Sequence, residues 1–125
     1  MYNRCDEGDA VTAVAAAYFK AMVDADEAEL RRVFHPNASV IGHFEGEFDF
    51  ASLEQFIETT PDAKTGDAPF EYRVEGLVLV GDTAVISVGG YCYGTWFTDH
   101  LSMVKIADEW KIVAKVFYAH SQEWR

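Results

Sequence analysis

The sequence predicts an α+β fold in which helices come first and an antiparallel sheet follows. Apolar residues recur with the 3.6-residue period of a helix over residues 9–24. From residue 70 onward they alternate with polar residues, at the two-residue period of strands. Short turns separate these later strands, so we expect an antiparallel meander, with the overall order α-α-β-β-α-β-β-β-β.

Three segments have the pattern of a helix. In the first, residues 9–24, one wide face is apolar. That face carries Val11, Val14, Ala15, Tyr18, Phe19, Met22 and Val23. Asp26 followed by Glu29 resembles a capping box that opens a second helix. Ser52 followed by Gln55 has the same spacing and predicts the start of a third helix.

The strands are predicted from alternation and from turn residues. Residues 38–44 form a strand, and residues 47–50 a short returning strand. Gly81-Asp82 is predicted to be a two-residue hairpin turn. The strand that follows this turn contains Gly89-Gly90, which predicts a bend or bulge within that strand. Residues 59–69 have the composition of a surface loop.

The composition restricts the classes of function. The chain has 125 residues and is 50% hydrophobic, so we expect residues 1–125 to form one domain. Its net charge of −11 disfavours nucleic acid and membrane surfaces as partners. The N-terminus lacks the charged and apolar regions of a signal peptide, and the two cysteines form no disulfide framework and suit a reducing compartment, so we expect a cytoplasmic protein. No phosphate-binding loop or metal motif is present, so we expect no cofactor and no metal.

Three segments carry a resemblance to a known family. They are LRRVFHPNA at residues 30–38, WFTDHLSMVK at residues 96–105 and WKIVAKVF at residues 110–117. They are similar to segments of a bacterial subfamily labelled "putative lumazine-binding", within the nuclear-transport-factor-2-like superfamily, whose fold is also called cystatin-like. The resemblance implies a curved antiparallel sheet that wraps around a long first helix and encloses a cavity. This fold serves both enzymes and binding proteins, so it does not identify an activity.

The chain also resembles, more distantly, the ketosteroid isomerases. The resemblance places their oxyanion-binding tyrosine on Tyr18 and their oxyanion-binding aspartic acid on Asp99, but it places their catalytic base on Gly42. The missing part is therefore the proton acceptor. His43 is a candidate for this role, because the ordinary pKa of histidine suits proton transfer near neutral pH. Alternation along the strand points His43 away from the cavity, however, unless Gly42 permits a bulge.

The register of the last hairpin decides whether Asp99 faces the cavity. If Asp108-Glu109 is a two-residue loop, Asp99 pairs with Tyr118 on a largely apolar inner face, and Lys115 lies on the outer face. A three-residue loop would turn His100 inward instead. We favour the first register, which agrees with the isomerase resemblance.

We favour a small-molecule-binding domain whose cavity accepts a small apolar or aromatic molecule. Its expected ligand-binding residues are Tyr18, Trp96, Asp99, Leu101, Met103 and Tyr118. One alternative is an isomerase or dehydratase that moves a proton next to a carbonyl, with Tyr18, Asp99 and His43 as catalytic candidates. Another is a non-catalytic dimeric interaction module.

We also expect a homodimer through the outer face of the sheet. That face is predicted to expose apolar side chains, and such a patch usually meets a partner. The residues assigned to it are Val104, Val113 and Phe117.

Overall fold

A computed structural model describes residues 4–60, 71–92 and 94–120. These residues form three helices and a six-stranded sheet, in the predicted order α-α-β-β-α-β-β-β-β. Most of the predicted surface loop at residues 59–69 lies outside the described residues. None of the helices in the described part of the chain has both the length and the apolar content needed to cross a membrane.

The helices are α1 (Arg4–Asp24), α2 (Glu27–Val33) and α3 (Leu53–Thr59). Helix α1 begins at Arg4 rather than near residue 9, because Asp6 and Glu7 place carboxylates in its first turn, where they favour the positive end of the helix dipole. It ends where Ala25 takes a positive φ of 54°.

The two predicted caps differ in completeness. The Ser52 hydroxyl accepts a hydrogen bond from the Gln55 backbone at 3.2 Å, and the Gln55 side chain accepts one from the Ser52 backbone at 2.9 Å. That is a full capping box at α3. At α2 the Asp26 carboxylate accepts from the Glu29 backbone, whereas the Glu29 side chain binds Arg32 instead. The second box is therefore only half formed.

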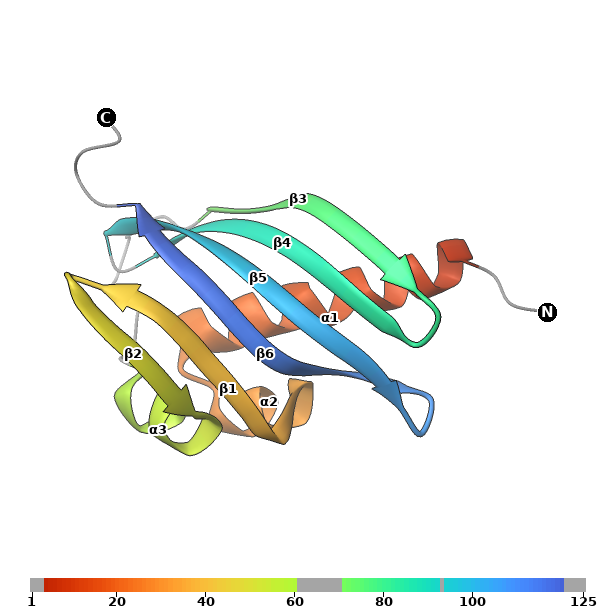
Figure 1. The fold of residues 1–125 in the computed structure, drawn as a ribbon, viewed down its shortest axis with the longest axis horizontal. Coiled ribbons are helices and arrows are strands. Elements are labelled where there is room, and N and C mark those ends of the chain that lie inside the picture. The colour runs from red at the N-terminus through yellow and green to blue at the C-terminus, as the bar shows by residue number, and fades with distance from the viewer. Residues whose placement is uncertain (1–3, 61–70, 93, 121–125) are drawn as a thin grey trace.

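The strands are arranged in the order β2-β1-β6-β5-β4-β3. Their bounds are β1 (Phe34–Phe44), β2 (Glu47–Ser52), β3 (Glu71–Val80), β4 (Thr83–Cys92), β5 (Thr95–Ile106) and β6 (Glu109–His120). Neighbours are antiparallel except β1 and β6, which run parallel in the middle of the sheet. Figure 1 shows α1 crossing behind the curved sheet, with α2 and α3 beneath β1 and β2.

Helix α1 packs closely on the sheet because a glycine leaves room for an aromatic ring. A Cβ on Gly90 would lie 2.0 Å from the ring of Phe19, which sits over this point of β4. No register shift between β4 and β5 falls at Gly89-Gly90, and the irregularity in the β3–β4 pair lies between Val74 and Gly76. A bulge at Gly89-Gly90, one of the two predicted possibilities, is therefore wrong, and the bulge lies on β3 instead.

The predicted register of the last hairpin is wrong. The turn residues are Ala107 and Asp108, both with positive φ, and Asp99 pairs with Phe117 rather than with Tyr118. By itself this turn would pair Asp99 with Val116. An irregularity then falls on β6, where Met103 pairs with Ile112 and Ser102 with Ala114. The extra residue, Val113, reverses the facing of every later residue of β6.

Candidate functional site

The centre of the site is a phenol and a carboxylate that meet inside the protein. Tyr18 comes from α1 and is fully buried, and Asp99 comes from β5 and is 2% exposed. The Tyr18 hydroxyl donates a hydrogen bond of 2.6 Å to Asp99 Oδ2. The structure therefore brings together a helix residue and a strand residue that are 81 positions apart in the sequence.

A buried lysine lies beside this pair. Lys115 of β6 is 5% exposed, and its Nζ lies 4.0 Å from Asp99 Oδ2. The amine also lies over three aromatic rings, with Nζ 4.6 Å from the ring centre of Phe56 and 5.2 Å from those of Tyr18 and Phe117. Aromatic faces attract a cation, so these rings and the carboxylate together suit a positive charge at Nζ.

A cavity of about 270 Å³ opens in front of Asp99 and Lys115. It lies between the end of α1, helix α3 and the strands β1, β2, β5 and β6. The residues that line it are Met22, Val40, Phe44, Asp49, Phe56, Thr59, Thr60, Phe97, Asp99, Lys115 and Phe117. The lining is thus mainly apolar and aromatic, with a few polar groups, which is the usual character of a small-molecule site.

The second oxygen of Asp99 makes this cavity chemically specific. Within the described residues, Asp99 Oδ1 is buried and has no hydrogen-bond partner, whereas Oδ2 is held by Tyr18. Buried carboxylate oxygens in proteins are normally hydrogen-bonded, and leaving one unpaired is unfavourable. A donor in the cavity would satisfy this atom.

At Gly42, where the resemblance places the catalytic base, there is no room for a side chain, but a carboxylate lies on the neighbouring strand. Gly42 faces inward, and a Cβ there would lie 2.5 Å from the Phe117 carbonyl oxygen and 2.8 Å from its ring. Asp49 of β2 is the direct cross-strand partner of Gly42 and lines the cavity. Cross-strand partners share a face of the sheet, so the Asp49 carboxylate reaches the cavity from β2 rather than from β1.

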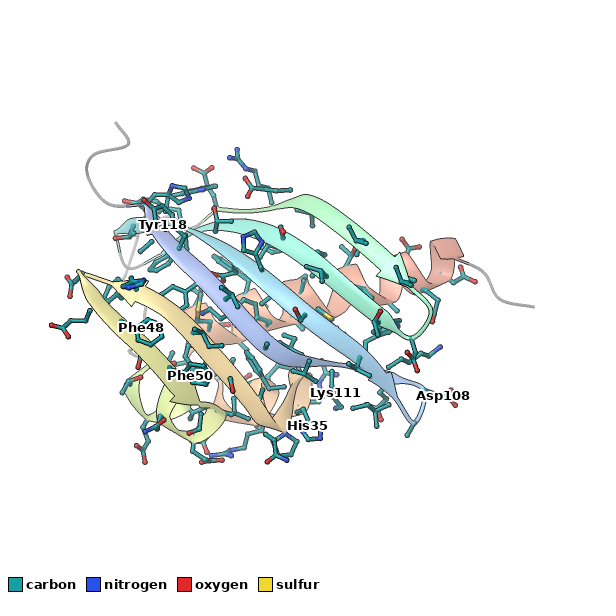
Figure 2. The ribbon with its side chains drawn as sticks, viewed as in Figure 1. His35, Phe48, Phe50, Asp108, Lys111 and Tyr118 are labelled. Carbon is teal, nitrogen blue, oxygen red and sulfur yellow. The ribbon has the colours of Figure 1, made fainter. Side chains whose placement is uncertain are left out.

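Several predicted site residues lie elsewhere. His43 is exposed on the other face of β1, where its ring lies 5.2 Å from that of Phe48. Tyr118 is 53% exposed because Val113 reverses the facing of this part of β6, and Figure 2 shows it near the end of that strand. Trp96 is half-buried, with the Arg73 guanidinium 4.8 Å above its ring.

The remaining predicted residues are interior but do not line the cavity. Leu101 is fully buried and Met103 is 1% exposed, and both belong to the main core under α1. Tyr18 itself is not part of the lining but contacts residues that are, among them Asp99 and Lys115. Phe117, assigned to the outer face by the predicted register, lines the cavity.

Sequence reasoning missed Lys115 and Asp49. Strand alternation counted from Ile112 puts Lys115 outside, and nothing local in WKIVAKVF signals the extra residue at Val113. Asp49 had a usable signal, because a two-residue turn at Glu45-Gly46 pairs Gly42 with Asp49 and puts both on the same face. Among the described residues, no group of three or more His, Cys, Asp or Glu side chains is arranged to hold a metal ion.

Comparison with known families and proteins agrees with this architecture. The family described as "Putative lumazine-binding" matches residues 6–118. Aldolase FrzH of a Cladobotryum species is 30% identical over 119 residues, which cover 91% of this chain and 92% of that protein.

Solved structures with the same fold are also similar. An NTF2-like protein of unknown function from Silicibacter pomeroyi superposes with a TM-score of 0.89 at 29% identity, over 95% of this chain and 100% of that one. A ketosteroid isomerase-like protein from Erwinia carotovora atroseptica has a TM-score of 0.70 at 13% identity, over 90% of this chain and 95% of that one. At 13% identity, the second likeness concerns the fold alone.

Proposed function

The chain belongs to the family described as "Putative lumazine-binding", and from that premise we propose that it binds a small, largely apolar molecule carrying a hydroxyl or carbonyl group. The observation that carries the proposal concerns Asp99, which lines an apolar cavity and whose buried Oδ1 has no hydrogen-bond partner among the described residues. A ligand hydroxyl would donate to this oxygen, and Lys115 Nζ would donate to a ligand oxygen. The cavity volume of about 270 Å³ favours a ligand of one or two small rings.

A matched series of ring compounds tests this proposal. Cyclohexanol, cyclohexanone and methylcyclohexane have similar shapes but differ in their hydrogen-bonding groups. In an NMR titration, we expect cyclohexanol to bind about tenfold more tightly than methylcyclohexane, because one buried hydrogen bond to a charged group contributes about 1.5 kcal/mol. Asp99→Asn should remove most of that difference. Equal affinity for the alcohol and the hydrocarbon would contradict the proposal.

A second candidate is an enzyme that moves a proton, or forms a carbon–carbon bond, next to a carbonyl. The observation that favours it is the pairing of a buried cation with a second carboxylate: Lys115 and Asp49 line the same cavity. The cation would stabilise negative charge on the carbonyl oxygen, and Asp49 would accept the proton. The relative named as an aldolase is consistent with chemistry of this class.

Proton exchange separates the enzyme from a simple binding protein. In deuterated water, the enzyme should catalyse loss of the protons next to the carbonyl of bound cyclohexanone, which NMR follows directly. Asp49→Asn should abolish this exchange, whereas Glu47→Gln, at an exposed residue of the same strand, should leave it unchanged. Binding without exchange would favour the first candidate.

A further inference from the structure

Lys115 has an environment that few lysines share. Its side chain leaves the inner face of β6 between Val40 of β1 and Leu101 of β5, and it is almost completely buried. Lysine is rarely found fully buried unless it is paired or functional. Its nitrogen stands at the wall of the cavity, with Asp99 on one side and aromatic rings on the others.

We propose that the Lys115 amine condenses with a small aldehyde or ketone in this cavity to form an imine. The proposal rests on the proposed function, because the carbonyl compound must first occupy the cavity. It goes further in assigning a covalent role to one nitrogen and in restricting the ligand to a reactive carbonyl compound.

The surroundings of Nζ suit the product as well as the starting amine. A protonated imine carries the same single positive charge as the ammonium that it replaces. The aromatic ring of Phe56 and the carboxylate of Asp99 therefore continue to face a cation after condensation. Because the charge does not change, burial adds no new penalty for creating it.

The step balances with the groups present. Asp99 takes one proton from the Lys115 ammonium, and the neutral nitrogen attacks the carbonyl carbon. Proton transfer from nitrogen to the former carbonyl oxygen gives a neutral carbinolamine. Asp99 then returns its proton to the hydroxyl, water leaves, and the nitrogen forms a double bond to carbon. The net change is ammonium plus carbonyl to protonated imine plus water, with Asp99 restored.

Tyr18 would act as a positioning residue in this step. Its hydroxyl holds Asp99 Oδ2 at 2.6 Å and so fixes the carboxylate beside Nζ. Oδ1 belongs to the same carboxylate, and Asp99 lines the cavity in which the carbonyl oxygen and the departing water would lie. One carboxylate thereby serves both the amine and the bound oxygen.

Reductive trapping tests the proposal on the full chain. The protein is incubated with butyraldehyde or cyclohexanone and sodium cyanoborohydride, and the labelled lysines are identified by peptide mass spectrometry. Lys20 is the solvent-exposed reference: its side chain is 76% exposed, and its amine is ion-paired with Asp24 at 2.7 Å. We expect Lys115 to be labelled about tenfold faster than Lys20, because the cavity holds the carbonyl next to the amine. Unfolding in guanidinium should abolish that preference.

Matched variants distinguish the imine from its surroundings. Lys115→Arg keeps the charge but cannot form an imine, so it should lose only the fast labelling. Lys111→Arg, at the neighbouring lysine of β6, should label like the unmodified protein. Labelling of Lys115 no faster than Lys20 would overturn the proposal. If cyclohexanol still binds in that case, only the imine fails; if it does not bind, the proposed function fails as well.

Discussion

At the scale of single residues, the contact between Tyr18 and Asp99 is the interaction on which the site depends. The phenol satisfies one oxygen of a carboxylate that is 2% exposed, in an interior that offers little solvation. Without the Tyr18 hydroxyl, neither Asp99 oxygen would have a donor within hydrogen-bond distance among the described residues, because Lys115 Nζ lies 4.0 Å away. The pair therefore links the stability of the core to the chemistry of the cavity.

Tyr18→Phe should lower the free energy of unfolding by about 1–3 kcal/mol, because it strips a hydrogen bond from a buried charged group. Urea denaturation followed by circular dichroism gives the value. Tyr118→Phe is the matched control, since Tyr118 is 53% exposed and its change should be close to zero. Equal effects at the two tyrosines would show that the Tyr18 hydroxyl contributes nothing specific.

At the scale of secondary-structure elements, the packing of α1 on β4 depends on a missing side chain. A Cβ on Gly90 would lie 2.0 Å from the Phe19 ring, whereas one on Gly76 of the neighbouring strand would meet nothing within 4 Å. Gly90→Ala should therefore destabilise the fold by about 1–3 kcal/mol through overpacking. Gly76→Ala should change stability little. Thermal unfolding of both variants checks the comparison.

The contact between α2 and α3 predicts a dependence on pH. Arg31 binds Glu54 through two hydrogen bonds, of 2.5 and 2.9 Å, and this contact holds the pKa of Glu54 below its ordinary value of 4.5. A carboxylate whose pKa is lowered by folding stabilises the folded state above its unfolded pKa. That contribution is lost as the pH falls through the folded value. Both side chains are solvent-exposed, so the effect is small.

Glu54→Gln should accordingly lower the melting temperature slightly at neutral pH. The difference from the unmodified protein should begin to shrink near pH 4.5 and vanish once the pH is below the lowered pKa of Glu54 in the folded protein. Scanning calorimetry across this range measures it. Glu58→Gln, at an exposed residue of the same helix, provides the comparison, and a difference that grew in acid would contradict the assignment.

At the scale of the whole molecule, the sequence predicted the architecture better than the site. Periodicity, caps and turn residues are local signals, and together they predicted the element order and the full capping box at Ser52. The parallel pairing of β1 with β6 and the extra residue at Val113 are tertiary features without a local signal. That single residue moved Lys115 into the cavity and Tyr118 out of it.

The same reversal changes which residues can form the predicted dimer. Phe117 faces the cavity, so the outer face on this side of the sheet is made by other apolar residues. Phe48, Phe50 and Tyr118 are 62%, 64% and 53% exposed, and Val116 is 43% exposed. Ile41 pairs with Phe50 on one side and with Val116 on the other, so these residues form a continuous patch across β2, β1 and β6. Figure 2 shows Phe48 and Phe50 along β2 and Tyr118 at β6.

We expect two copies of the chain to associate through this outer patch, since exposed apolar surface of this kind usually meets a partner. The net charge of −11 on each copy opposes association, so salt should strengthen the dimer by screening that repulsion. Sedimentation equilibrium at low and high salt measures both effects. Phe50→Ser should weaken the dimer about tenfold or more, as expected for a central aromatic contact. Ile106→Ser, which removes a 41% exposed apolar side chain at the far end of β5, should not. A monomer at micromolar concentration in high salt would contradict the prediction, because apolar burial would then be too weak even without charge repulsion.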